Sequence, residues 1–428
     1  MSIYDAAVIG RGAIGSVAAL AFARAGWRVA LIGPRPAPGS AGGTRPAAAE
    51  EAPGWDQRVY ALSPASRALL TELGIWQGLD PARIAPVHDM RIFHNRGKGA
   101  ASPPEVHLDA YGGRVEALAW IVENRELQGA IDKAIAGALP SVKLSRVDAE
   151  VDGLTLPLTA EERRPASLDL VGGGKLAAHL VVAADGTSSR LRDLAGIDYV
   201  SRDYEQTAIV ANFEADRPHR DCAWQWFGDF GVVALLPLPS DDLEYGRSRV
   251  SLVWSAPIGQ AVRALAAGGT QGDQANPSLA GEIQTMTGNR LGSLRLITPP
   301  ASFPLRTVRC RQVIKPSFVL IGDAAHAIHP MAGQGMNLGF GDVRGLMDHL
   351  LAQPRLSAAS SRAPDWLALR RYERSRREPV ATMQLAMDGL YRAFGDLPAP
   401  LVGLRDLGWS IVARSSWLRR RMIDHAVS

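Results

Sequence analysis

IYDAAVIGRGAIG, residues 3–15, joins a short apolar run directly to a glycine-rich turn. Residues 3–9 predict a buried strand, residues 13–25 an alanine-rich helix, and residues 27–32 a second strand. A GxGxxG turn inside such a βαβ unit is typical of nucleotide binding. Its first glycine makes the turn, its second admits a pyrophosphate, and its third lets helix and strand pack closely. A purely structural glycine turn is the less favoured alternative.

The second strand lacks the acidic residue that usually ends it and binds a ribose hydroxyl. Gly33 occupies that position. Glu50 and Glu51 are too far along the chain to replace it. We therefore expect ribose binding through other groups, such as Arg35 or the backbone, beside a Pro/Ala/Gly-rich loop over residues 34–54.

A second glycine-rich stretch, GDAAHAIHPMAGQGMNLGFGD over residues 322–342, follows the apolar run SFVLI. The order predicts a strand, a loop and a helix that begins near Asn337. Gly333 and Gly335 would let the backbone approach a ligand closely. The first turn of the helix would direct free N–H groups and the positive end of its dipole at that ligand. The stretch therefore predicts a site for a planar or anionic ligand.

The composition limits the functional classes. The 428 residues carry a net charge of +4, and no Lys/Arg block is interleaved with aromatic residues, which argues against nucleic-acid binding. Cys222 and Cys310, without a CxxC pair, indicate a reducing compartment. Neither a membrane-spanning run nor a signal peptide is visible, so we expect a cytoplasmic protein. Arginines over residues 370–377 and 419–421 form either a solvated helix face or a surface for anionic lipid, which would make the protein peripheral to the inner membrane, or for an acidic partner.

Element patterns further along the chain predict two domains and a helical tail. The patterns are helical over residues 61–79, 121–139 and 257–292, and strand-like over residues 142–183, 204–255 and 316–321. Because a parallel-type strand returns near residue 316, the nucleotide-binding domain is expected to be discontinuous. We assign to it residues 1–84, 116–194 and 306–350, to an inserted antiparallel-sheet domain residues 85–115 and 195–305, and to a C-terminal helical region residues 351–428.

Three segments resemble the motifs of the flavoprotein aromatic hydroxylases, the class A FAD-dependent monooxygenases, in the family's order. They are GRGAIG at 10–15, ADGTSSRLR at 184–192 and the stretch at 322–342. Further matches, closest to the UbiH/UbiF/VisC group of ubiquinone-biosynthesis hydroxylases, are DQRVYALSPASRALLTELGIW at 56–76, VEN at 122–124 and YEQTAIVAN at 204–212. The resemblance implies an α/β (α+β) fold like that of p-hydroxybenzoate hydroxylase. Such a fold has a Rossmann-like FAD-binding domain interrupted by an antiparallel-sheet substrate domain and followed by helices.

The resemblance also implies FAD as the cofactor and gives roles to individual residues. Asp323 would accept a hydrogen bond from the ribityl chain, and Arg58 and Arg125 would lie beside the flavin and its pyrophosphate. N–H groups at the start of the helix near Asn337 would stabilise negative charge on the reduced flavin. The implied cofactor-binding residues are Gly10, Gly12, Ala13, Ile14, Gly15, Arg58, Arg125, Asp185, Gly322, Asp323, Pro330, Gly333, Gly335, Met336 and Asn337.

Asp185 and Gly186 have two interpretations of about equal weight. They resemble the family's second fingerprint, which is associated with FAD and pyridine-nucleotide binding. They could equally form a structural strand-to-helix turn in which Arg190 or Arg192 holds Asp185. His326 and other nearby histidines show no metal-ligand pattern, so no metal is expected.

The expected mechanism follows from the resemblance. NADPH or NADH docks transiently, since the chain has no second GxGxxG, and reduces FAD. Molecular oxygen then forms a flavin C4a-hydroperoxide, which hydroxylates an electron-rich aromatic ring. The flavin carries the chemistry, so no catalytic residue is assigned.

The substrate is an aromatic compound, and the resemblance favours a prenylated phenol of ubiquinone biosynthesis. A cavity for the prenyl chain is predicted to be lined by Trp224, Trp226, Phe227 and Leu235, although each could be an ordinary core residue. The alternatives are a hydroxylase of a small soluble aromatic, and a non-catalytic scaffold of a biosynthetic complex, for which Gly33 is the only support. Contact with a membrane surface or a biosynthetic complex would suit the late arginines.

Overall fold

The computed structural model describes residues 3–34, 54–94, 105–139, 142–162, 164–240, 246–266, 278–328, 334–351, 365–394 and 408–427. Five residues named above therefore lie outside the described residues: Arg35, Glu50, Glu51, Pro330 and Gly333.

A mainly parallel sheet contains the N-terminal βαβ unit. Its strands run in the order β18-β19-β11-β1-β2-β8; β10 pairs antiparallel with β11, and β9 pairs antiparallel with β10. Since β1 pairs in parallel with both β2 and β11, the glycine-rich turn after β1 lies at the centre of the sheet. The strands are β1 (Ile3–Ile9), β2 (Val29–Gly33), β8 (Leu144–Asp148), β9 (Val151–Thr155), β10 (Ala166–Leu170), β11 (Gly174–Ala183), β18 (Ile314–Lys315) and β19 (Phe318–Leu320).

Both faces of this sheet are buried, which explains why β1 is apolar at nearly every position. Ala6 and Val8 pack on one face against a layer of helices, while Ala7 and Ile9 pack on the other against β9, β10 and α5 (Arg190–Leu194). The helices of the first layer are α1 (Ala13–Arg24), α2 (Pro64–Glu72), α4 (Asn124–Ala138), α8 (Gly335–Leu346) and α9 (Trp366–Phe394).

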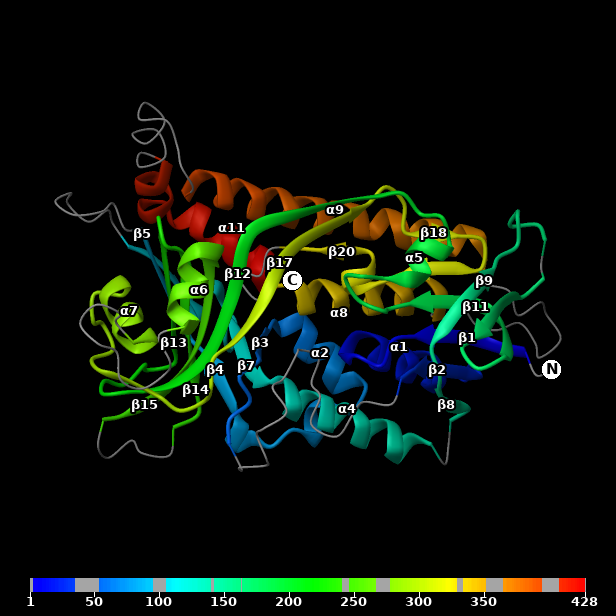
Figure 1. The fold of residues 1–428 in the computed structure, drawn as a ribbon, viewed down its shortest axis with the longest axis horizontal. Coiled ribbons are helices and arrows are strands. Elements are labelled where there is room, and N and C mark those ends of the chain that lie inside the picture. The colour runs from blue at the N-terminus through cyan, green and yellow to red at the C-terminus, as the bar shows by residue number, and fades with distance from the viewer. Residues whose placement is uncertain are drawn as a thin grey trace.

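An antiparallel sheet forms the second body of the fold, in the order β20-β17-β12-β15-β14-β13-β5-β6, with β16 beside β12. Figure 1 shows β12 as a long green strand that arches from this sheet towards α5. Helices α6 (Ile258–Ala266) and α7 (Leu279–Met286) cover one face of the sheet. The strands are β5 (Asp89–His94), β6 (Val106–Asp109), β12 (Tyr199–Ala215), β13 (Cys222–Gly228), β14 (Gly231–Leu238), β15 (Ser248–Pro257), β16 (Leu294–Leu296), β17 (Ala301–Cys310) and β20 (His326–Ala327).

A three-stranded sheet, β3-β7-β4, contacts both α8 and β14 and so links the two larger sheets. The C-terminal helices complete the molecule. Figure 1 shows α9, in orange, running from the parallel sheet to the antiparallel one, with α11 beside it. The elements not yet given are β3 (Val59–Leu62), β4 (Ile84–Val87), β7 (Ala119–Glu123), α3 (Ala110–Gly113), α11 (Ser416–Val427), the 3-10 turns η1 (Trp76–Gly78), η2 (Pro81–Arg83) and η3 (Gly322–Ala324), and a π-helical turn, η5 (Met347–Leu351).

The structure confirms the predicted fold class and corrects two helix boundaries. The helix predicted from residue 121 begins at Asn124, because residues 121–123 are the end of β7 and pair with β3 and β4 on either side. The helix predicted from residue 61 begins at Pro64, since Ser63 caps its N-terminus with a hydrogen bond to the Ser66 N–H. The division into domains stays a proposal, and β17 crosses the proposed boundary between residues 305 and 306.

Two further observations complete the fold. Within the described residues, every helix is too short or too polar to cross a membrane. Cys222 and Cys310 are free thiols in β13 and β17. Burial raises the pKa of Cys222 to about 12 and that of Cys310 to about 11.

Candidate cofactor and active site

A cavity of about 2630 Å³ extends from the glycine-rich turn after β1 to the C-terminal helices. One end is lined by polar backbone and charged side chains from the parallel sheet, and the other by apolar side chains from the antiparallel sheet, α9 and α11. Such a volume exceeds the roughly 300–1,000 Å³ of an ordinary small-molecule pocket. The cavity can therefore hold a large cofactor together with a second ligand.

The GxGxxG turn has no room for a side chain at Gly10 or Gly15, whereas Gly12 is open. A Cβ on Gly10, whose φ is +112°, would lie 2.1 Å from the Ala184 carbonyl oxygen, and a Cβ on Gly15 would lie 2.0 Å from the Gly10 carbonyl oxygen. A Cβ on Gly12 would meet no atom within 4 Å, so its open side faces the cavity that it lines. Gly12 is also the N-cap of α1, where unpaired N–H groups favour an anion.

A fully buried carboxylate, that of Asp342, holds the turn that follows β19. Asp342 accepts hydrogen bonds from the Gly322 N–H (2.8 Å), His326 Nε2 (2.7 Å) and Arg376 Nε (2.8 Å). Gly322 has a φ of +59° and packs against Ile14 of α1. Asp342 therefore fixes the turn that presents the next residue, Asp323, to the cavity. His326 is thus a buried residue that packs and hydrogen-bonds beside this turn.

Asp323 lines the cavity and is exposed to it, although protein atoms surround its carboxyl closely. Burial raises the pKa of its carboxyl, while His326 and Arg58 act in the opposite direction. Arg58 also lines the cavity, and its guanidinium lies 5.5 Å from the ring centroids of both Tyr60 and Phe303. The structure thus brings Asp323 and Arg58 together, although 265 positions separate them in the sequence.

Helix α8 begins at Gly335, so Gly335, Met336 and Asn337 form its first turn, and all three line the cavity. The Asn337 side chain fixes this turn to the start of α2. Its Oδ1 accepts from the Ser63 N–H (3.0 Å) and the Ser66 hydroxyl (2.7 Å), and its Nδ2 donates to the Ala61 carbonyl (2.9 Å). The first turn of α8 is thereby held at the wall of the cavity.

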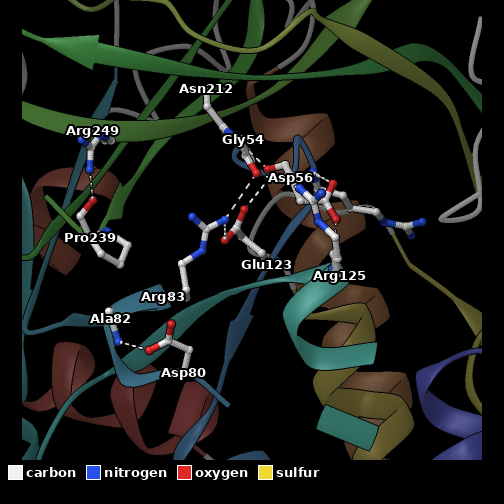
Figure 2. Close-up of polar contacts among 11 residues, drawn as sticks. Gly54, Asp56, Asp80, Ala82, Arg83, Glu123, Arg125, Asn212, Pro239 and Arg249 are labelled. Carbon is white, nitrogen blue, oxygen red and sulfur yellow. Dashed lines mark hydrogen bonds and ion pairs between the residues drawn. The ribbon is translucent and has the colours of Figure 1, made fainter. Parts of the chain in front are cut away.

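Arg125 belongs to a polar cluster between α4, the small sheet and β12, drawn in Figure 2. Its Nη2 donates to the Gly54 carbonyl (2.8 Å), and its N–H donates to Asp56 Oδ2 (3.0 Å). The buried carboxylate of Glu123 forms an ion pair with Arg83 (2.6 Å) and accepts a hydrogen bond from the Asp56 N–H. Burial raises the pKa of Glu123 even beside Arg83.

Asn212 connects this cluster to the antiparallel sheet. The side chain is fully buried in β12, and its Nδ2 donates to the Asp56 carbonyl (2.8 Å), as Figure 2 shows. The segment around Asp56 therefore joins β7 of the small sheet to β12 of the large one. Both Asn212 and Glu123 lie within the sequence matches described above, but no role could be assigned to either from the sequence.

The structure favours the structural interpretation of Asp185. Its two carboxylate oxygens accept from the Ser189 hydroxyl (2.5 Å) and the Leu191 N–H (3.0 Å), which stabilises the start of α5. Arg192 does not bind Asp185. It donates instead to the Ala324 and Thr187 carbonyls, 3.1 Å away in each case. Of this turn, Gly186 and Thr187 line the cavity.

The four residues predicted to line a substrate cavity divide between two faces of the sheet. Phe227 lines the cavity, and so does Trp224, whose ring centroid lies 5.9 Å from that of Phe93. Trp226 and Leu235 do not line it: they are buried in the core beneath α6 and α7. The prediction for these two residues is corrected. Trp224, Trp226 and Leu235 lie on the same face of the sheet, since Trp224 pairs with Leu235 and stacks on Trp226 with ring centroids 6.2 Å apart. Phe227, the neighbour of Trp226, points to the opposite face, and Trp224 reaches the cavity only at its border.

Most of the apolar lining could not be located from the sequence. On α9, Met383, Met387 and Leu390 recur at helical spacing, which indicates an apolar face but not what it covers. Further apolar lining residues include Met90, Ile92, Val106, Leu108, Leu118, Trp409, Val412, Met422 and Ile423.

Comparison with known proteins identifies the family. A model described as "FAD binding domain" matches residues 138–385. The chain is 33% identical to the ubiquinone hydroxylase UbiL of Rhodospirillum rubrum, over 99% of this chain and 90% of the relative. It is 32% identical to the 3-demethoxyubiquinol 3-hydroxylase of Escherichia coli, over 99% and 98%. The chain belongs to the FAD-dependent aromatic hydroxylases.

Solved structures of low sequence identity support the same fold for this hydroxylase. p-Nitrophenol 4-monooxygenase PnpA from Pseudomonas putida DLL-E4 aligns with a TM-score of 0.71 at 16% identity, covering 100% of this chain and 98% of that one. PqsL of Pseudomonas aeruginosa, solved with 2-aminobenzoylacetate, aligns with a TM-score of 0.70 at 19% identity, covering 95% and 99%.

FAD fits the polar half of the hydroxylase cavity. The open side of Gly12 and the N-termini of α1 and α8 would supply backbone N–H groups for a pyrophosphate and for an anionic ring edge. Bound FAD takes electrons from NAD(P)H and activates molecular oxygen for ring hydroxylation. The chain is therefore an FAD-dependent monooxygenase rather than the scaffold that Gly33 could have indicated.

Proposed function

We propose that this hydroxylase acts on a ubiquinone precursor that carries a polyprenyl chain. One observation carries the proposal: the cavity lined at one end by the flavin cradle is lined at its other end by apolar side chains, which form an apolar chamber. The chamber is bounded by β5, β6, β13 and β14 on one side and by α9 and α11 on the other. A ring held at the flavin would place its apolar tail in this chamber.

The chamber suits a flexible chain better than a rigid ring. Its lining is rich in methionine, whose unbranched side chain adapts to irregular apolar ligands. Met383 and Met387 come from α9, Met90 from β5 and Met422 from α11. The names of the two relatives support the same class of substrate, because both describe hydroxylases of ubiquinone or its precursors.

We also propose that the residues predicted from the motifs hold FAD. Gly12 and the first turn of α1 would bind the pyrophosphate, and Asp323 would accept from the ribityl chain. The first turn of α8 would stabilise negative charge on the flavin ring, and Arg58 would balance Asp323. The geometry gives each group a cavity-lining position.

The test compares two substrates that share a ring and differ only in the tail. Purified holoenzyme is supplied with NADPH and either a 2-polyprenylphenol or the same phenol without the chain, and hydroxylated product is measured. The Ala223→Phe variant narrows the chamber from β13, where Ala223 is buried and lines the cavity. We expect this variant to lose turnover of the prenylated phenol while it still oxidises NADPH with the short one.

Quinone profiling of a deletion strain provides the second arm. Accumulation of an intermediate that lacks one ring hydroxyl would support the proposal and would name the position. Brisk product formation from a small soluble phenol, together with an unchanged quinone profile, would overturn it in favour of a catabolic hydroxylase.

We further propose that the prenyl chain reaches the chamber from an anionic membrane surface. Helix α11 lines the chamber with Ile423 and exposes Trp417 to solvent at 65%. Arg420 and Arg421 lie on the same helix, and the Arg421 guanidinium lies 5.6 Å from the Trp417 ring. An exposed aromatic ring beside clustered cations favours anionic headgroups.

Vesicle sedimentation tests this surface. Binding to phosphatidylglycerol vesicles should exceed binding to phosphatidylcholine vesicles and should fall in the Trp417→Ala/Arg420→Gln variant. The matched control is Arg370→Gln/Arg371→Gln, which removes two exposed cations from α9. Equal binding to both vesicle types, or an equal loss in the control, would show that this helix is not the contact surface.

A further inference from the structure

The end of β2 departs from the usual dinucleotide-binding arrangement, in which an acidic side chain binds the adenosine ribose. Gly33 is the last residue of β2 and pairs with Asp148, the last residue of β8. An acidic residue is therefore present at this edge of the sheet, but it lies one strand further out. Gly33 itself provides no side chain.

Arg11 occupies the space that a side chain at position 33 would need. It is the second residue of the GxGxxG turn, and a Cβ on Gly33 would lie 3.1 Å from Arg11 Cγ. The Arg11 side chain reaches across Gly33 to Asp148, where Nη1 and Oδ1 are 2.6 Å apart. Because Gly33 has no side chain, Arg11 has the space to reach Asp148.

The remaining donors of Arg11 point to a ligand. The side chain is 11% exposed, and Nε and Nη2 are buried without a hydrogen-bond partner among the described residues. Leaving donors of a charged group unpaired in the interior is costly, so such groups normally have partners. Arg11 lines the cavity at its glycine-rich end together with Gly12 and Pro34. A bound molecule that offers acceptor oxygens at this point would satisfy both donors.

We propose that Arg11, held in place by Asp148, binds the ribose hydroxyls of the adenosine half of FAD. A hydroxyl can both donate and accept, so an arginine can bind it as well as a carboxylate can, with the direction of the hydrogen bond reversed. The pyrophosphate is served by the N–H groups at the start of α1, which leaves the ribose oxygens for Arg11. Arg11 and Asp148 together replace the acidic residue that Gly33 lacks.

The first test needs no variant. The full chain is stripped of FAD, and ADP or 2′,3′-dideoxy-ADP competes with FAD while flavin fluorescence reports the bound fraction. We expect ADP to compete better by roughly tenfold, the value of one hydrogen bond to a charged group. Arg11→Met should abolish that preference and should weaken FAD binding by a similar factor. FMN, which lacks adenosine, should bind equally well to both proteins.

Matched variants separate this role from a structural one. Asp148→Asn should weaken FAD less than Arg11→Met does, because it only loosens the guanidinium. Arg146→Met removes the exposed pair with Asp132 from the same strand and should leave FAD affinity unchanged. The double variant Arg11→Ala/Gly33→Asp restores the usual acidic arrangement and should recover the preference for ADP.

Three results would each overturn the proposal. One is equal competition by ADP and dideoxy-ADP in the unmodified protein. The second is an equal loss of affinity for both nucleotides in Arg11→Met, which would assign Arg11 to the pyrophosphate instead. The third is a loss of FMN affinity equal to that of FAD, which would show a general disturbance of the site.

Discussion

Asp342 is fully buried and accepts hydrogen bonds from the backbone of η3, from His326 and from Arg376 of α9. Asp342→Asn would replace one acceptor oxygen by a donor and leave two cations without a counter-charge. Breaking a buried ion pair in this way costs about 3–5 kcal/mol. We expect urea unfolding to show a loss of that order. Glu72→Gln, which removes the exposed partner of Arg344 on α8, should cost less than about 1 kcal/mol.

The buried cluster of Asp342, His326 and Arg376 also makes the stability of the protein depend on pH. Burial alone would lower the pKa of His326, but the Asp342 carboxylate outweighs it, so the pKa is raised above 6.5. Because the folded pKa is raised, the stability that His326 contributes is complete below 6.5 and is lost as pH rises through the folded value. The pKa of Asp342 is lowered, so its contribution is lost only as pH falls through a value below 3.8. The contribution of Asp323 to stability changes in a separate pH window that begins near pH 3.8, because burial raises the pKa of its carboxyl.

Thermal unfolding measured at increasing pH checks this dependence. The melting temperature should decline above pH 6.5, and His326→Asn should remove that decline while lowering stability at acid pH. His107→Asn, which breaks a half-exposed pair with Asp89, is the control and should keep the decline. If the melting temperature of His326→Asn still declined above pH 6.5, another group would be responsible for the decline.

At the scale of elements, α1 and α8 approach closely because Gly339 has no side chain. A Cβ at this position would lie 2.7 Å from Ile14 Cδ1 and 3.5 Å from the Gly322 backbone. Gly339→Ala should therefore destabilise the protein by about 1–3 kcal/mol, as overpacking does. Chemical denaturation measures this loss of stability, and adding Ile14→Val to the Gly339→Ala variant should recover part of it. Gly389→Ala in α9 meets no atom within 4 Å and should not be destabilising.

The sequence predicted those elements that are defined by local patterns. The βαβ unit, the start of α8 and the hairpin-rich middle of the chain were all found, because glycine spacing and apolar runs are short-range signals. The side of β13 that faces the cavity could not be found. CAWQWF is apolar at most positions, so neither face stands out, and Trp226 was placed in the cavity although it belongs to the core. Likewise, nothing local indicated that Arg11 would lie over Gly33 or that Asn212 would reach Asp56.

At the scale of the molecule, the cavity has walls from different sheets, so activity depends on how these sheets are held together. Asn212 of β12 and Glu123 of β7 both bind the backbone of Asp56. Asn212→Ala should leave NADPH oxidation largely intact but reduce the fraction of turnovers that yield hydroxylated product, because the ring would be held less exactly at the flavin. The ratio of product to NADPH consumed measures this coupling. Unchanged coupling in a folded variant would contradict it.

The raised pKa values of the two thiols affect which side chains are oxidised during turnover. A flavin enzyme that reduces oxygen releases hydrogen peroxide whenever a turnover fails, and peroxide attacks thiolates rather than thiols. With pKa values of about 12 and 11, Cys222 and Cys310 stay protonated and should survive. The methionines that line the chamber have no such protection. Peptide mass analysis after many uncoupled turnovers should find sulfoxide at Met383 and Met387 before any oxidised cysteine, and each added oxygen would make the chamber less suited to an apolar tail.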